Sequence, residues 1–390
     1  MSKWVPALAA FLFTMAGAAG SGQRSPGTDS FLFSNNDSPA FINSVTFYTI
    51  GSGGLPVRTA AVSTGGMGVG GGFFAASRLL VVPAGSIICV FASDAGTGDI
   101  AGIDASTQTV TGNFAASSSD IGLANGIGMA ANGSYLYASY STSSTIGTFS
   151  IEAGCELSFV SDILAFGLNN GDVTGMAVHG NLLVVTYGDG SIGTFDITGG
   201  APVSNNDTRF STGSREDHFP NGVDITADGH FAIFGDASTV GTVEIANISS
   251  GKLTNTIPYH VTTGWNSGSV RLSPDESVIF VTNSSSGQVT AEFFDKNTGK
   301  VSPGCTSSIL KNFYTQWSYA GRVALQSTAG AGGLVYVPEF GANGFSSIGL
   351  LEYTITGNTC SLTELPASPV SNTIDPAALF SIEVFPPRPF

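Results

Sequence analysis

A short phrase of alternating residues recurs along the chain and limits the folds open to it. Four clear copies are SIGTFDI (Ser191–Ile197), TIGTFSI (Thr145–Ile151), TVGTVEI (Thr239–Ile245) and SIGLLEY (Ser347–Tyr353). Three looser copies are SVTFYTI (Ser44–Ile50), DIAGID (Asp99–Asp104) and QVTAEFF (Gln288–Phe294). The second residues of these seven copies lie 55, 46, 46, 48, 49 and 59 residues apart. Short strands repeating every ~40–50 residues are typical of four-stranded blades, so the sequence predicts an all-β, seven-bladed β-propeller.

Two further predicted strands precede most copies of the phrase. In the clearest unit, Gly268–Ser273 is followed by the turn Pro274-Asp275-Glu276 and the β-rich run Val278–Thr282. Other units use Asn-Gly or Asp-Gly at this turn, which favours a hairpin. The phrase is therefore expected to be the third of four antiparallel strands. The Gly-led strand is expected innermost, because small residues fit where strands crowd around a central channel.

The two ends of the repeat do not match each other. The first β-rich run, Phe31–Ser34, is of the second-strand type and has no inner strand before it. Ala378–Val384, near the C-terminus, can supply that strand. One blade is therefore expected to contain both termini, which removes open sheet edges. On this interpretation residues 21–390 form a single propeller domain.

The N-terminal segment has the features of a targeting signal. Lys3 is followed by the apolar run Val5–Thr14 and by small residues at 16–20, which predicts a secretory signal peptide over residues 1–20. An uncleaved anchor is the alternative, but the run is shorter than the ~20 residues that a membrane span needs. Export permits disulfides, and four cysteines allow three pairings. We expect Cys89–Cys155 and Cys305–Cys360, whose members lie in consecutive blades.

Charge limits the classes of partner. The net charge is −15, and only 13 residues are Lys or Arg. Nucleic acids and anionic membrane surfaces both attract concentrated cations, and no basic run occurs in the sequence. We therefore expect neither nucleic acid nor membrane as a partner. We also expect a monomer, located in the secreted or periplasmic space as the N-terminal segment predicts.

The order of elements within a blade resembles a known family. Each blade is expected to have an inner strand, a Pro-Asp or Asp-Gly turn, a second strand ending in Asn or Asp, and then the S/T-I/V-G/S strand. This order is similar to that in blades of the seven-bladed lactonase family. That family includes 6-phosphogluconolactonase-type and carboxymuconate-cyclase-type propellers. Ser269–Val301 is the most similar segment, and the resemblance extends from Phe31 to about Pro387. It implies a lactonase-type site of His, Arg and Glu side chains on the face reached by the outer-to-inner loops.

The loop Ser214–Asn221, which leads into the fifth blade, carries residues of these types. His218 could act as general acid or base, with its pKa tuned by Glu216 or a neighbouring Asp. Arg215 could hold a substrate carboxylate through its forked guanidinium, and Asn221 adds an amide for substrate binding. Their spacing matches no strict motif. The alternative is a solvated polar loop in which Arg215 pairs locally with Glu216.

Aromatic residues occupy two further loops of the same class. The segment Lys311–Arg322 leads into the seventh blade and ends in a second cation, Arg322, for an anionic substrate. We expect four aromatic side chains to form a wall on which a substrate ring could stack, namely Trp265, Tyr314, Trp317 and Tyr319. The alternative is that these aromatic side chains cap the propeller.

Carboxylates recur after the second strands, at Asp94, Asp189, Asp236 and Glu339. Ca²⁺ binds several oxygen ligands at once, but equal spacing around a ring keeps these groups apart. We expect them to be turn residues, and we expect no metal and no other cofactor. Gly65–Gly72 has neither the strand-then-helix setting nor the Lys of a phosphate-binding loop, which indicates a flexible crossover.

The sequence leaves two functions open. The first is an exported lactonase-like hydrolase or cycloisomerase-type enzyme that acts on a small cyclic ester or on the lactone of a sugar or organic acid. The second is a non-catalytic propeller that binds a carbohydrate or protein partner, since one fold can serve many functions. An enzyme for anionic lactones should gather its few Arg side chains at one channel mouth, whereas a binding scaffold should scatter them.

Overall fold

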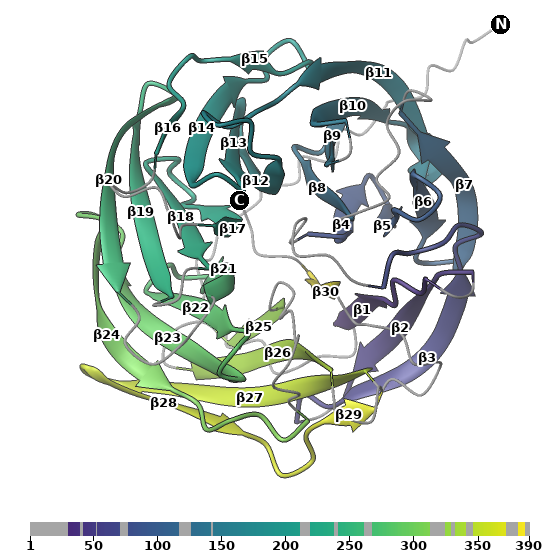
Figure 1. Cartoon of the computed structure of the whole chain (residues 1–390). Coiled ribbons are helices and arrows are strands. Elements are labelled where there is room, and N and C mark those ends of the chain that lie inside the picture. Colours follow the sequence, from purple (N-terminus) through teal and green to yellow (C-terminus); the bar gives the residue numbers. More distant parts are fainter. Residues whose placement is uncertain are drawn as a thin grey trace, which may run out of the picture.

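Seven small β-sheets stand in a ring around a central axis (Figure 1). The computed structural model describes residues 30–39, 42–51, 53–70, 77–116, 126–141, 143–210, 219–237, 241–260, 267–312, 324–328, 332–340, 346–371 and 381–386. Within these ranges the only helical element is the short 3₁₀ helix η1 (Ala153–Cys155). The predicted seven-bladed β-propeller is therefore confirmed.

Each blade runs from an inner strand at the channel to an outer strand at the rim. The first blade contains, in that order, β30 (Ser381–Phe385), β1 (Phe31–Asn35), β2 (Ser44–Ile50) and β3 (Pro56–Ser63). The second contains β4 (Leu79–Ala84), β5 (Ile87–Asp94), β6 (Asp99–Asp104) and β7 (Thr109–Ala115). The third contains β8 (Ile127–Ala131), β9 (Tyr135–Tyr140), β10 (Thr145–Ile151) and β11 (Leu157–Leu164). The fourth contains β12 (Val173–His179), β13 (Leu182–Tyr187), β14 (Ser191–Asp196) and the short outer pieces β15 (Val203–Ser204) and β16 (Arg209–Phe210).

The last three blades follow the same order. The fifth contains β17 (Pro220–Ile225), β18 (Phe231–Asp236), β19 (Thr242–Ser249) and β20 (Lys252–His260). The sixth contains β21 (Ser267–Leu272), β22 (Val278–Asn283), β23 (Gln288–Asp295) and β24 (Lys300–Thr306). The seventh contains β25 (Ala324–Thr328), β26 (Gly332–Phe340), β27 (Ser346–Thr356), β28 (Thr359–Glu364) and β29 (Val370–Ser371).

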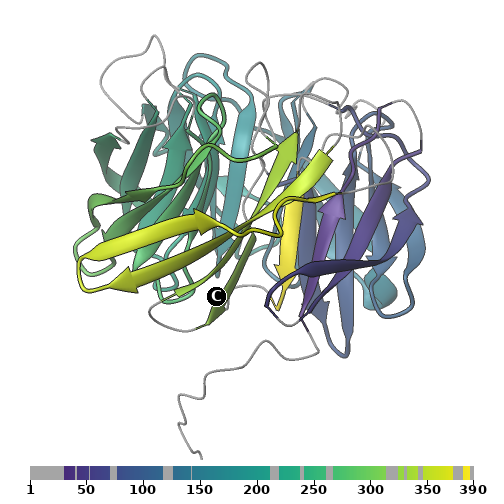
Figure 2. The same cartoon turned by 90° about the horizontal axis from the view of Figure 1, so that it is seen from below.

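The two ends of the chain close the ring in one blade, as the sequence predicts. Strand β30 pairs antiparallel with β1 along their full length, from Phe31 opposite Phe385 to Asn35 opposite Ser381 (Figure 2). Ile382 is completely buried, in a cluster shared with the seventh blade that includes Tyr336 and Leu350. This pairing covers an edge that would otherwise be left open on the first blade.

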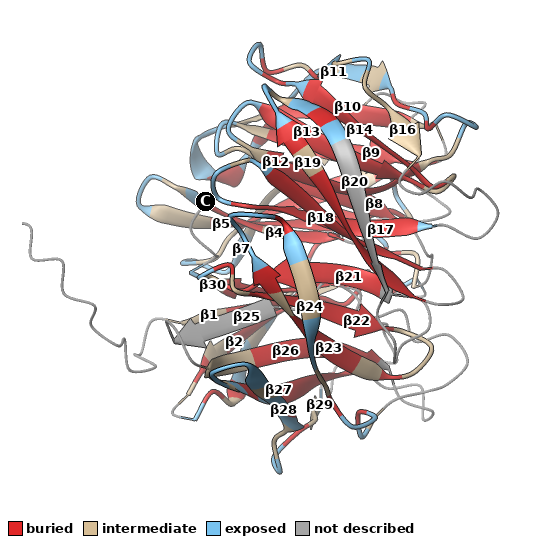
Figure 3. Cartoon of the chain, turned by 90° about the vertical axis from the view of Figure 1, so that its left-hand side faces the viewer, coloured by how far each residue is buried: buried red, intermediate tan, exposed pale blue. Residues whose placement is uncertain are grey.

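The core lies between neighbouring blades rather than in one central mass. In the inner strands, alternate residues point sideways into the next sheet, because successive side chains of a strand point to opposite faces. Val223 and Ile225 of the fifth blade pack with Val184 of the fourth. The inner and middle strands are accordingly mostly buried, while exposure concentrates on outer strands and turns (Figure 3).

Two disulfides join consecutive blades, with the pairing expected from the sequence. Cys89 on β5 is bonded to Cys155 in η1, with their Cα atoms 5.3 Å apart. Cys305 on β24 is bonded to Cys360 on β28, with their Cα atoms 5.6 Å apart. No helix in the described part of the chain is long and apolar enough to cross a membrane.

The glycine-rich segment begins the crossover from β3 to β4. The Gly68 N–H donates to the Ser38 carbonyl over 2.8 Å. A Cβ atom on Gly68 would lie 2.2 Å from the carbonyl carbon of Asp37, closer than any real contact. Close backbone packing therefore requires glycine at this position. Residues 71 and 72 lie outside the described ranges.

Candidate functional site

Hydrogen bonds bring two classes of loop together on one face of the ring. Asp189, after the second strand of the fourth blade, accepts hydrogen bonds from the backbone N–H groups of Asn169 (2.6 Å) and Gly171 (3.2 Å) in the loop that enters that blade. In the fifth blade, Asp236 accepts one from the Phe219 N–H over 2.7 Å. The loops that lead from an outer strand into the next inner strand thus contact the ends of the second strands. Equivalent loops of a closed propeller emerge on the same face, so both classes of loop lie on one face of the ring.

The other two recurrent carboxylates accept hydrogen bonds from neighbouring loops and strands. Asp94 accepts from the Asn43 amide (2.7 Å) and from the Thr64 hydroxyl (2.9 Å). Glu339 accepts from the Ser347 hydroxyl over 3.5 Å. Within the described ranges, no group of three or more His, Cys, Asp or Glu side chains is placed to hold a metal ion.

Two of these carboxyl groups are buried deeply enough to change their acidity. Burial raises the pKa of Asp94 to about 7, although the hydrogen bonds from Asn43 and Thr64 oppose the shift. Burial raises the pKa of Glu339 to about 8, and the nearby Glu364 carboxylate adds to the increase. Removal of a carboxyl from water disfavours its charged form. Glu339 therefore keeps its proton at neutral pH.

A buried ion pair that the sequence analysis missed lies where the ring closes. Arg78, just before β4, contacts Asp37 with Nη1 and Oδ2 2.6 Å apart, and both side chains are almost fully buried. Its backbone N–H donates to the Ser381 hydroxyl over 2.8 Å. Arg78 thus links the second blade to both strands that close the first. Burial raises the pKa of Asp37, and the Arg78 charge opposes the rise.

Of the predicted site residues, Asn221 lies in the described part of the chain. It is the second residue of β17, is 8% exposed and pairs with Gly235 at a point where the strand register shifts before Val223. The others lie outside the described ranges and stay predictions, namely Arg215, Glu216, His218, Trp265, Tyr314, Trp317, Tyr319 and Arg322. Their segments connect β16 to β17, β20 to β21 and β24 to β25, which are all outer-to-inner connections.

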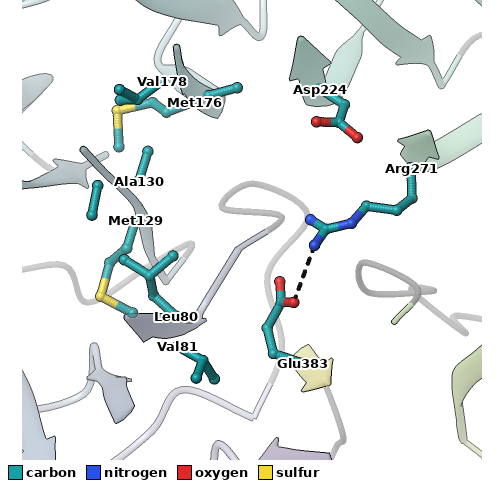
Figure 4. Close-up of a pocket in the computed structure, with 11 residues that line it drawn as sticks. Leu80, Val81, Met129, Ala130, Met176, Val178, Asp224, Arg271 and Glu383 are labelled. Carbon is teal, nitrogen blue, oxygen red and sulfur yellow. Dashed lines mark hydrogen bonds and ion pairs between the residues drawn. The ribbon is translucent and has the colours of Figure 1, made fainter. Parts of the chain in front are cut away.

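A second polar site lies inside the channel. Residues of six inner strands line a partly open cavity of about 60 Å³ there. Asp224 (β17), Arg271 (β21) and Glu383 (β30) form its polar side, and an apolar wall that includes Met129 and Met176 faces them (Figure 4). The Arg271 and Asp224 positions are each the fifth of six residues in their strands. Asp224 and Arg271 therefore lie toward the ends of their strands that are remote from the outer-to-inner loops.

The three charged groups of the channel are held in different ways. Arg271 is 5% exposed, and its Nη2 atom donates to Glu383 Oε2 over 3.4 Å. Asp224 accepts hydrogen bonds from the N–H groups of Ile225 (3.0 Å) and Leu272 (2.9 Å). Burial raises the pKa of Glu383; Arg271 opposes this shift and Asp224 adds to it.

Comparison with known proteins supports the fold through structure, not through sequence. No protein-family model matches the chain. No curated protein sequence matches it either. A functionally unknown protein from Desulfotomaculum acetoxidans superposes with a TM-score of 0.58 and 14% identity, over 85% of this chain and 98% of the other. A putative 6-phosphogluconolactonase from Bacteroides fragilis superposes with a TM-score of 0.55 and 13% identity, over 70% of this chain and 79% of the other. The periplasmic gluconolactonase of Pseudomonas aeruginosa superposes with a TM-score of 0.54 and 15% identity, over 71% of this chain and 82% of the other.

The chain has a seven-bladed β-propeller fold. At these identities the likeness concerns the arrangement of blades and leaves the reaction open. The charged residues of the channel were also missed by the sequence analysis. Their signal is nevertheless present, since each is a charged residue between two apolar ones in an inner strand: Val-Asp-Ile at 223–225, Val-Arg-Leu at 270–272 and Ile-Glu-Val at 382–384.

Proposed function

We propose that this protein is an exported lactonase that opens a small cyclic ester, such as the lactone of a sugar acid or organic acid, at the channel mouth. The observation that carries the proposal is a loop containing Arg215, Glu216 and His218 in an outer-to-inner connection of a lactonase-like propeller. Two solved structures of similar fold are described as a putative 6-phosphogluconolactonase and a periplasmic gluconolactonase.

The reaction follows from the chemistry of these residue types. His218, with Glu216 beside it in sequence, takes a proton from water, and the resulting hydroxide attacks the lactone carbonyl carbon. The ester C–O bond breaks, and the same imidazolium returns the proton to the ring oxygen that leaves. The product is an open hydroxy acid. Asn221 offers its amide to the substrate carbonyl or hydroxyl groups.

Substrate binding in this scheme combines charge and stacking. Arg215 and Arg322 hold an anionic group on the substrate, because a guanidinium matches carboxylate and phosphate oxygens in pairs. The aromatic side chains of two neighbouring loops cover a flat or sugar-like ring, namely Trp265, Tyr314, Trp317 and Tyr319. In a chain with a net charge of −15, two cations at one mouth give a local attraction for small anions.

Export is part of the proposal. The charged and apolar N-terminal segment predicts cleavage that leaves residues 21–390 as the mature propeller. The two disulfides are consistent with folding in an oxidising compartment.

The test compares two histidines of the same blade in the mature chain. His218→Ala should reduce lactone hydrolysis by about 10²–10⁴-fold, the usual contribution of a general acid or base. His230→Ala is the matched control, because this side chain is 67% exposed in the hairpin between β17 and β18, where its ring pairs with the equally local Asp228. Full activity of His218→Ala would remove His218 from the mechanism. Absence of hydrolysis across a lactone panel would favour the carbohydrate- or protein-binding propeller.

A further inference from the structure

The cavity inside the channel combines a buried cation with an apolar wall. The Arg271 side chain is 6% exposed, and its Nη1 atom has no hydrogen-bond partner within the described ranges. Buried donors in proteins are almost always hydrogen-bonded, so an unmatched guanidinium N–H beside a cavity indicates where an acceptor belongs. The guanidinium extends from β21 toward Glu383 and the open space beside it (Figure 4).

The neighbouring carboxyl groups do not take up this donor. The contact between Arg271 Nη2 and Glu383 Oε2 is 3.4 Å, long for a charge-assisted hydrogen bond. Asp224 directs its two carboxylate oxygens to the backbone N–H groups of Ile225 and Leu272. Glu383 is buried, which favours its protonated form. Arg271 thus keeps hydrogen-bonding capacity that these contacts do not use.

Size and polarity restrict what can bind there. At 10–15 Å³ for each water-sized group, a cavity of about 60 Å³ has room for roughly four to six non-hydrogen atoms. Met129, Met176 and Val178 line the side opposite the charges. Thioether and aliphatic groups favour a short hydrocarbon tail over a second charge.

We propose that the channel cavity binds a short-chain monocarboxylate, with its carboxylate on Arg271 Nη1 and its hydrocarbon tail against Met129 and Met176. Glu383 belongs to the closing strand β30, whereas Arg271 belongs to the sixth blade. An anion held at this point therefore lies between the closing strand and the remainder of the ring. Its binding should stabilise the whole propeller, because a ligand that binds only the folded state raises the unfolding temperature.

Three small probes of different charge test the proposal on the wild-type mature chain: propionate, its neutral isostere propionamide, and the cation n-propylammonium. A ligand of about five non-hydrogen atoms cannot bind more tightly than about micromolar, so titration extends to tens of millimolar at matched ionic strength. Propionate should raise the unfolding temperature in a saturable way, and the other two should not. No saturable shift with propionate, or a larger shift with n-propylammonium, would overturn the proposal.

Variants then locate the binding. Arg271→Gln should weaken propionate binding by roughly 10- to 150-fold, the range for loss of a hydrogen bond to a charged group. Glu383→Gln should bind propionate at least as tightly as the wild type, because an amide accepts a hydrogen bond from Arg271 less strongly than a carboxyl group that can ionise. Arg58→Gln, at an exposed position of the outer strand β3, is the control and should bind as the wild type does.

Unchanged binding in Arg271→Gln, or its loss in Glu383→Gln, would refute this placement of the carboxylate. If Arg271→Gln does not fold, the three probes on the wild type still decide the question. The residues that line the cavity are not among the predicted lactonase residues, so the channel site and the proposed hydrolysis can fail independently.

Discussion

Closure of the ring by strand β30 gives the most quantitative prediction. Ile382 is completely buried between the first and seventh blades. Replacement by Ala removes three carbon atoms, worth about 2.4 kcal/mol at ~0.8 kcal/mol each. The cavity left behind adds to this, so the expected loss in the free energy of unfolding is about 3–4 kcal/mol, within the usual range for such substitutions.

Ile309→Ala is the matched control for this experiment. It removes the same atoms from a side chain that is 63% exposed, and it should change stability by less than about 0.5 kcal/mol. Urea unfolding of both variants, followed by far-UV circular dichroism, measures the difference as a shift of the midpoint. If the two variants lost equal stability, β30 would not be an integral strand of the closed ring.

Two further predictions concern the cross-links and buried acids. Replacing Cys89 and Cys155 by Ala removes a cross-link that spans 66 residues. The loop-entropy relation predicts that the free energy of unfolding falls by up to about 4 kcal/mol, measured by urea unfolding. An unchanged urea midpoint would contradict this prediction. The unfolded chain ionises Glu339 near its ordinary pKa of 4.5, whereas the folded chain retains the proton up to about pH 8. The contribution of Glu339 to stability is therefore greatest below pH 4.5 and falls as the pH rises to about 8, so Glu339→Gln should flatten the decline in unfolding temperature between pH 5 and pH 8.

Much of the fold could be predicted because blade residues report their own packing. The repeat phrase marks one strand per blade, and the unmatched run Phe31–Ser34 shows that an inner strand must come from elsewhere. Alternation such as Val223–Ile225 identifies the side chains between blades. The disulfides follow because their cysteines fall in neighbouring blades.

The sites were less predictable because they depend on contacts between distant segments. Asp37 and Arg78 meet although 41 residues separate them, and nothing local in the sequence marks the pair. Arg271 and Glu383 come from the sixth and first blades, 112 residues apart, so only the closed ring brings them together. The role of Gly68 was unpredictable for the same reason, since its close approach to Asp37 becomes visible only in three dimensions.

The most direct measurement of the proposed function is the initial rate of lactone opening by the mature chain, compared with spontaneous hydrolysis in the same buffer. Gluconolactone and a 6-phosphorylated gluconolactone form a pair that differs in charge. We expect a rate proportional to protein concentration and a higher kcat/KM for the phosphorylated lactone, because Arg215 and Arg322 are proposed to hold an anion. Rates equal to those of buffer alone for these and other small lactones would contradict the assignment as a lactonase.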